Sequence, residues 1–268
     1  MVTQPAQSPG SSRIKTRQDT RHILPWAIVA LVAIGLALYG PIAQLEHYHD
    51  FADHRSWMGI PNAGDVLSNL GFAVVGGYGL ALVLRTRHNA ALDAIRTGYG
   101  LFSFALILTA FGSGWYHLVP DNARLVWDRL PIALACAGIL SAVWRDTLED
   151  GRWVDWLWAI LAFVSVMWWW YTDNHGVGDL RPYLYVQFMP LLLIPLLQWR
   201  NNASVRERWY FAAAIGLYVL AKAAELLDHL IFQHVDYLSG HTIKHLFSVL
   251  AGLVIVLNYA HRKKEAEN

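Results

Sequence analysis

Eight apolar runs of about twenty residues, separated by short polar segments, account for most of this chain of 268 residues. Each run is long enough to cross a hydrocarbon core of roughly 30 Å as an α-helix. Backbone groups in lipid must pair within the protein, so only helices or closed barrels span membranes, and apolar runs of this length select helices. The sequence therefore predicts an all-α, polytopic transmembrane bundle with helices at about 23–45, 66–84, 97–118, 125–144, 153–172, 182–199, 209–232 and 240–259.

The composition supports lipid as the solvent of this chain. Hydrophobic residues make up 55% of it and charged residues only 15%, whereas soluble domains carry roughly 25% charged residues. The single cysteine, Cys136, lies in an apolar run and has no partner for a disulfide, so we expect a small core residue. The net charge of +1 carries little information for a membrane protein, and we expect no nucleic-acid partner. The sequence leaves the oligomeric state open.

Basic residues alternate between the two sides of the predicted membrane. The N-terminal tail, the loops after the second, fourth and sixth helices, and the C-terminus together hold fifteen Lys and Arg residues. The opposite loops hold only Arg55, Arg124 and Arg181. Because loops rich in Lys and Arg stay in the cytoplasm, this pattern predicts that both termini are cytoplasmic.

The predicted organisation has four parts. Residues 1–22 are rich in Ser, Gln, Pro and basic residues and are expected to form a disordered cytoplasmic tail. Residues 23–45 are long enough to span the membrane and are not followed by a usual cleavage motif, so a retained helix is favoured over a signal peptide. Residues 46–262 are expected to form a seven-helix membrane domain, and 263–268 a short cytoplasmic tail.

Unusual polar residues collect in the outer half of the predicted bundle, whereas the inner halves of the same helices are nearly pure Leu, Ala, Val and Phe. Ionisable residues inside a membrane are rare and mark functional sites by default. This layer consists of Asp65, Ser68, Asn69, Ser113, His117, Asp128, Lys222, Glu225, Asp228, His229, His241 and His245.

Three histidines of this layer suggest a metal site. His241 and His245 are four residues apart, so their imidazoles stack on one side of a helix and can bind one ion. A third imidazole from His117 would complete a three-histidine site with the fourth position left to water, which is typical of catalytic zinc. The nearby carboxylate of Asp128 could accept a proton from that water.

Other interpretations of these residues stay open. A pair of histidines four apart is a weak signal by itself, because histidines at helix ends in the membrane interface are common and this chain has 12 of them. Lys222 and Glu225 are favoured as a structural ion pair, with tuning of the histidines as the alternative. Three of the remaining histidines adjoin cytoplasmic basic residues and are expected to be solvated: His22, His88 and His261. The others lie in outer loops and are not expected to be metal ligands: His47, His49, His54, His175 and His234.

Three motifs resemble those of the alkaline ceramidases and their bacterial relatives. These motifs are Gly-Ser-Gly-Trp-Tyr-His at 112–117, Trp-Asp-Arg-Leu-Pro at 127–131 and Ser-Gly-His-Thr-Ile-Lys-His at 239–245. The pattern is also similar to the wider superfamily that includes the adiponectin receptors, whose members share a Ser, an Asp and three His around a membrane-embedded zinc. The resemblance covers about residues 50–260.

The resemblance implies zinc ligands His117, His241 and His245, a catalytic Asp128, and Ser113 as a hydrogen-bond donor beside the metal. The helix at 23–45 is additional to the seven-helix core of the eukaryotic enzymes. Their acidic calcium-binding cluster is matched only loosely here, by Asp50, Asp53, Asn62 and Asp65, and an ordinary acidic loop is the alternative to bound Ca²⁺.

The expected function is zinc-dependent cleavage of the amide bond of a ceramide-like lipid to a fatty acid and a sphingoid base. The resemblance implies an inner-membrane protein of a bacterium, with its active site toward the periplasm. A receptor or scaffold that holds zinc without turnover is the alternative. A transporter is disfavoured, because alternating access needs polar groups leading to both sides of the membrane.

Overall fold

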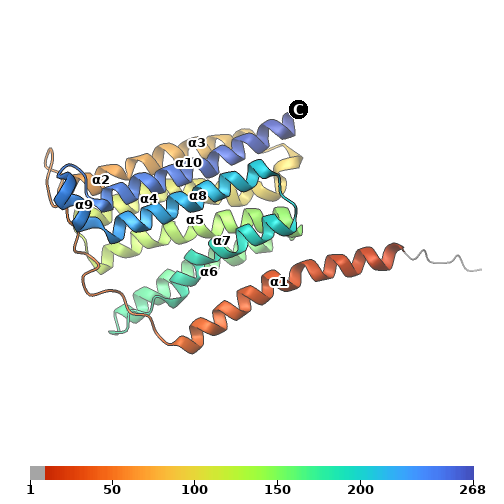
Figure 1. The fold of residues 1–268 in the computed structure, drawn as a ribbon, viewed down its shortest axis with the longest axis horizontal. Coiled ribbons are helices and arrows are strands. Elements are labelled where there is room, and N and C mark those ends of the chain that lie inside the picture. Colours follow the sequence, from red (N-terminus) through yellow and green to blue (C-terminus); the bar gives the residue numbers. More distant parts are fainter. Residues whose placement is uncertain (1–9) are drawn as a thin grey trace, which may run out of the picture.

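The computed structural model describes residues 10–268, with side chains from residue 22 onward, and it confirms the all-α prediction. Long helices run side by side to form one bundle, and α1 lies along its outside (Figure 1). Within the described residues, the only strand-like pairing is an isolated bridge between Trp57 and Ile60. The elements are α1 (Gly10–Tyr39), α2 (Ala63–Ser68), α3 (Leu70–Arg85), η1 (Ala90–Leu92), α4 (Asp93–Leu118), α5 (Asn122–Leu148), α6 (Trp153–Asp173), α7 (Arg181–Arg200), α8 (Val205–Leu226), α9 (Asp228–Val235) and α10 (Gly240–Glu267).

Seven helical segments in the described part of the chain are long and apolar enough to cross a membrane, which fits a multi-pass membrane protein. The eighth predicted span is present as α7, but it is not among these seven. Three prolines and two glutamines lower the mean hydropathy of α7, although its middle, 189–197, is nearly all apolar. Several α7 side chains, including Met189, Leu193 and Leu197, are fully buried inside the bundle.

Helix α1 begins at Gly10, inside the segment expected to be a disordered tail. A helix that is already nucleated extends at little cost per residue, so the apolar part of α1 can carry helical structure into the polar residues before it. Residues 1–9 of the predicted tail lie outside the described residues.

Two predicted helices are interrupted near one end of the bundle. The helix expected at 66–84 begins earlier, at Ala63, and is broken at Asn69, which joins α2 to α3. The helix expected at 209–232 ends at Leu226, and a separate short helix, α9, starts at Asp228. The carboxylate of Asp228 accepts hydrogen bonds from the backbone N–H groups of Ala52 and His241, and these bonds anchor the chain at the break.

Helix α1 is joined to the rest of the molecule along α7. The Tyr185 hydroxyl donates to the carbonyl oxygen of Val29 at 3.0 Å, and Arg181 donates to the carbonyl of Leu36 at 3.1 Å. The ring of Trp26 stacks on that of Trp153, with centroids 6.0 Å apart. The additional N-terminal helix is therefore packed against the bundle and is not a free extension.

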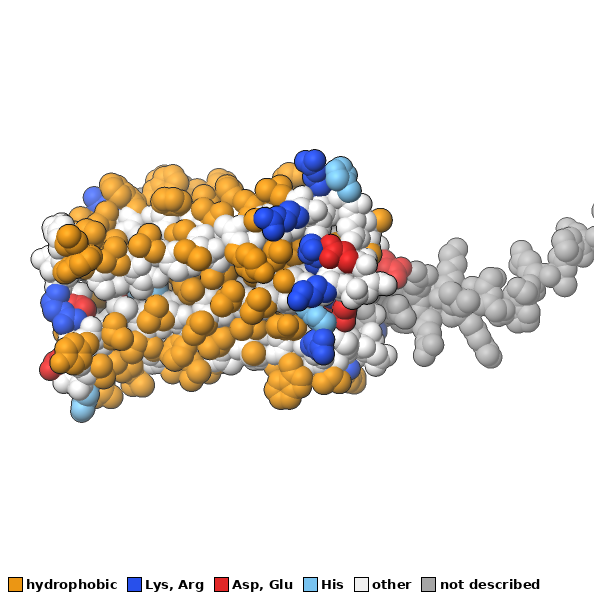
Figure 2. Space-filling view, turned by 90° about the horizontal axis from the view of Figure 1, so that it is seen from above, with side chains coloured by type: hydrophobic (Ala, Val, Ile, Leu, Met, Phe, Trp, Pro, Cys, Tyr) orange, Lys and Arg blue, Asp and Glu red, His pale blue; other side chains and the backbone are white. Residues whose placement is uncertain are grey.

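The start of α1 and the end of α10 lie at the same end of the bundle (Figure 1). On the face seen in Figure 2, hydrophobic side chains cover the body of the bundle, and most Lys and Arg side chains gather at this end. The end of α10 and the loops between α3 and α4, α5 and α6, and α7 and α8 lie there, so the charge alternation predicted along the sequence is an asymmetry in space.

Candidate metal centre

Three imidazoles meet at the opposite end of the bundle. His117 lies in the last turn of α4, and His241 and His245 lie in the first two turns of α10. One ring nitrogen from each lies within 4.8 Å of the others, and all three side chains are buried. Because α4 ends and α10 begins at the same level, two helices far apart in sequence bring the three predicted ligands together.

The spacing of the ring nitrogens fits one metal ion. Nε2 of His117 and Nε2 of His241 lie 3.3 Å apart. With Zn–N bonds of about 2.0–2.1 Å, the edge of a tetrahedron around zinc is also about 3.3 Å. Nδ1 of His117 is buried without a hydrogen-bond partner among the described residues. Neutral imidazoles at this separation suit a divalent ion, and these three residues can hold one.

Hydrogen bonds around the histidines set their orientation. Nδ1 of His245 lies 2.8 Å from the Ser68 hydroxyl, which itself donates to the carbonyl oxygen of Asp65. In this arrangement Nδ1 carries the proton, and Nε2 keeps its lone pair for a metal. Metal-bound histidines commonly donate their other ring N–H to a supporting group in this way. The side-chain amide of Asn62 donates to the carbonyl oxygen of His117 and holds the end of α4.

The start of α10 is anchored separately. Ser239 is its N-cap and accepts a hydrogen bond from the backbone N–H of Thr242. The hydroxyls of Thr242 and Ser239 both donate to Oδ1 of the buried Asp65, at 2.6 and 3.3 Å. The ring of Phe51 packs on the rings of His117 and His241, with centroids 4.9 and 4.3 Å away.

Ser113 and Asp128 lie beside this cluster, as predicted. Ser113 is one turn before His117 on α4, and Asp128 lies in the second turn of α5. The Ser113 side chain is hydrogen-bonded to the Asp128 carboxylate, and both residues are at least nine-tenths buried. Ser113 is therefore placed to orient Asp128, in addition to any contact with a ligand.

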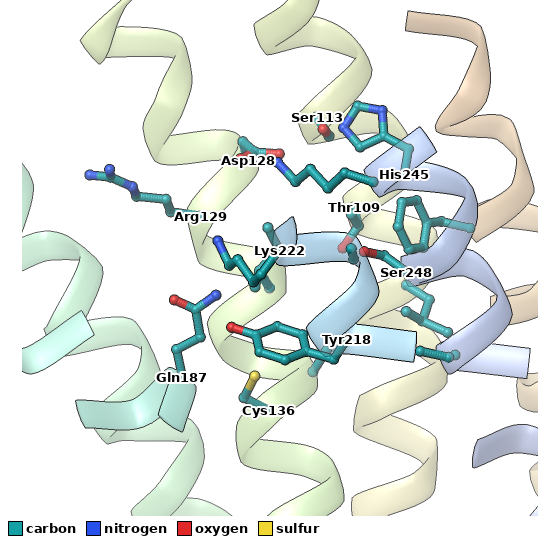
Figure 3. A pocket seen from close by; sticks show the side chains of 18 of the residues that line it. Thr109, Ser113, Asp128, Arg129, Cys136, Gln187, Tyr218, Lys222, His245 and Ser248 are labelled. Carbon is teal, nitrogen blue, oxygen red and sulfur yellow. The ribbon is translucent and has the colours of Figure 1, made fainter. Parts of the chain in front are cut away.

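A cavity of about 300 Å³ opens from the cluster into the bundle. Ser113, Asp128 and His245 line one end of it, and Gln187, Tyr218 and Cys136 line the other (Figure 3). Between these ends the walls are mostly apolar, contributed by Phe72, Phe102, Leu106, Ile132, Ile139, Leu184 and Ile255. The shape and lining suit a molecule with a long apolar chain and a polar group directed at the histidines.

Two basic residues of the site were not singled out from the sequence. Lys244 lies between the two histidines of α10, and its Nζ is 3.4 Å from Nε2 of His241 and 2.8 Å from Glu225. Arg129, next to Asp128, is 2% exposed and its guanidinium lies over the ring of Trp169 at 4.0 Å. A lysine and an arginine inside predicted membrane helices were the signal that could have identified them.

The expected pairing of Lys222 with Glu225 is confirmed, with 2.6 Å between Nζ and Oε2. Asp228 anchors the backbone of His241, whereas His229 is exposed and lies 3.7 Å from the Asp50 carboxylate. The other histidines do not join the cluster. For example, His49 bonds to Tyr116 and Asn122.

In the structure, the residues considered as calcium ligands interact with other groups or are exposed. Both oxygens of Asp53 accept from Arg55, whose hydrogen bond holds the pKa of Asp53 below its usual value. Asp65 accepts from Thr242, Asn62 donates to His117, and Asp50 is exposed. Among the described residues, the three aspartates do not form a group that could share one ion. Calcium here stays a prediction that the observed pairing does not support.

A scan against protein-family models found no match to this chain, and a search of the curated proteins found none either. The resemblance to alkaline ceramidases therefore remains a prediction from three short motifs, and the geometry of the site carries the functional argument.

Proposed function

We propose that this protein is a zinc-dependent hydrolase that cleaves the amide bond of a ceramide-like lipid within the membrane. The observation that carries this proposal is the position of the cavity: it runs from the three-histidine cluster, past the Ser113–Asp128 pair, into a chamber with apolar walls. A lipid chain can occupy the chamber while its polar group lies beside the histidines.

His117, His241 and His245 would hold the ion. Because His245 lines the cavity, a fourth position on the ion would be open toward the cavity. A zinc ion bound there would supply a Lewis acid for the amide carbonyl and would lower the pKa of water to about 7. The resident metal is zinc in this proposal because three imidazoles with one position left to water are typical of catalytic zinc sites.

Asp128 would act as the proton carrier of the reaction. Its carboxylate faces the cavity and would accept a proton from the attacking water, then deliver that proton to the departing amine nitrogen. The bond that breaks is the amide C–N bond, and the products are a fatty acid and a lipid amine such as a sphingoid base. Ser113, beside the Asp128 carboxylate, would donate its one hydroxyl proton to the oxyanion as charge develops there.

The charge asymmetry supports a cytoplasmic location for the end of the bundle where α10 ends, with the histidine cluster on the opposite side. In a bacterial inner membrane that side would be the periplasmic one.

Incubation of the purified protein with a panel of amide and ester lipids, with and without a chelator, tests the proposal. We expect release of fatty acid from amide lipids, its loss in chelator, and its recovery when zinc is restored. A receptor or scaffold would retain zinc and ligand binding but release no product from any lipid of the panel.

A further inference from the structure

Charged side chains line the cavity in unequal numbers. Among the described residues these are Arg129, Lys222 and Lys244 on the positive side, and Asp128 and Glu225 on the negative side. One carboxylate, that of Glu225, serves both lysines, with 2.6 Å to Lys222 and 2.8 Å to Lys244. Counted together, the three cations of the cavity exceed its two carboxylates by one positive charge.

Arg129 contributes to this excess of positive charge. Its guanidinium packs on the rings of Trp169, Tyr48 and Tyr183. Its Nε and Nη1 atoms are buried and have no hydrogen-bond partner among the described residues. Unbalanced charge in an apolar medium is costly, so an anion that enters this cavity is favoured. A bound divalent metal would add to the excess.

The positive groups form a path from the surface to the histidines. The Lys222 side chain is 40% exposed and also lines the cavity, so it lies at a mouth of the cavity beside α8. Lys244 lies deeper, beside His241. The Glu225 carboxylate lies between the two lysines, and the rest of the cavity is lined mostly by apolar side chains. The complementary ligand therefore has a long hydrocarbon chain and an acid group close to its amide.

We propose that the cavity selects amide lipids whose polar head carries an acid group, and that Lys222 binds this group at the mouth of the cavity. The choice of an amide lipid rests on the proposed function, whereas the preference for an acid group rests on the charges of the cavity alone. A free fatty acid offers the same carboxylate, so the test includes it as a separate ligand.

The full-length protein in lipid nanodiscs, with metal removed by a chelator, is titrated with two matched pairs of ligands. The first pair is N-oleoylglycine and N-oleoylethanolamine, which share chain and amide and differ in the acid group. The second is oleate and oleyl alcohol. We expect N-oleoylglycine to bind at least about tenfold more tightly than its neutral partner, the ratio that one additional charge contact can supply.

Lys222→Met should bring that ratio to about one, and Lys222→Arg should preserve it. Lys263→Met, which changes a partly exposed lysine on the last turns of α10, should leave the ratio as in the wild type. Equal binding of the first pair by the wild type overturns the proposal without any variant. A preference confined to oleate also overturns it, because the anion site would then serve the product.

The outcome is separable from that of the proposed function, because binding is measured without metal or turnover. Tight, Lys222-dependent binding of the acidic amide by a protein that hydrolyses no lipid would refute hydrolysis and support this inference. Hydrolysis of amide lipids with no preference for acidic ones would support the proposed function and refute this inference.

Discussion

Gly112 of α4 lies directly against the backbone of Trp127 of α5, so that a Cβ atom at Gly112 would overlap the Trp127 carbonyl oxygen. The next residue along each helix is a member of the site, Ser113 on α4 and Asp128 on α5. The close approach of the two backbones therefore sets the distance between the serine and the carboxylate. Only glycine allows this approach without moving a helix.

Gly112→Ala should destabilise the protein by about 1–3 kcal/mol, the usual cost of overpacking a well-packed interior, and should separate Ser113 from Asp128. Gly114→Ala is the matched control, since its Cβ would come no closer than 4.0 Å to the nearest atom, the carbonyl oxygen of Val66. Thermal unfolding in detergent measures both. A Gly112→Ala protein as stable as Gly114→Ala would contradict the importance of this contact.

Purified without added metal, the protein should contain about one zinc per chain, because a single three-histidine site is present among the described residues. Metal analysis by mass spectrometry measures this content. The double variant His241→Ala, His245→Ala should contain almost none, whereas His175→Ala, which changes an exposed histidine, should match the wild type. Undiminished zinc in the double variant would remove the basis of the proposed function.

Ser68→Ala should weaken metal binding by about 10- to 100-fold, the range observed when a group that orients a metal-bound histidine is lost. The reason is that Ser68 is the partner of Nδ1 of His245, at 2.8 Å. Competition with a zinc-binding dye measures the affinity. Ser165→Ala is the control, because that buried hydroxyl donates only to the carbonyl oxygen of Ala162 in its own helix. Equal affinities of the two variants would mean that Ser68 does not position His245.

Asp128→Asn preserves the shape of the side chain and removes its capacity to accept a proton. Turnover should fall by at least about 10²-fold, as is typical when a general base is lost, while zinc content stays near that of the wild type. Product release and metal content are measured on the same preparation. Loss of zinc together with activity would make Asp128 structural, and full activity on every lipid that the wild type cleaves would exclude it as the base.

A reporter fused after Lys264 should behave as cytoplasmic, because the basic loops and the end of α10 lie at one end of the bundle. Enzymatic reporters that function on only one side of the membrane provide the measurement. A fusion after Gly176, in the loop between α6 and α7, should report the opposite side. A signal from the far side at Lys264 would invert the location of the metal centre.

The helix class and approximate spans followed from apolar run length, because hydrogen bonding in lipid leaves few alternatives. Helix interruptions did not. The chain breaks at Leu227 because the Asp228 carboxylate bonds to Ala52 and His241, residues far from it in sequence. Apolar residues continue beyond that point, at 230–232, so the pattern predicted one longer helix.

The sequence by itself indicated which residues form the histidine cluster, because His117, His241 and His245 fall at the same depth once the helices are oriented, and spacing of four places two of them on one face. Tertiary structure decided how close the nitrogens come and what surrounds them. Lys244, Arg129 and Glu225 enter the cavity from α10, α5 and α8, and their mutual distances depend on helix rotation and packing. Periodicity along one helix contains no information about the rotation of its neighbours, so the excess positive charge of the cavity could be recognised only in the folded bundle.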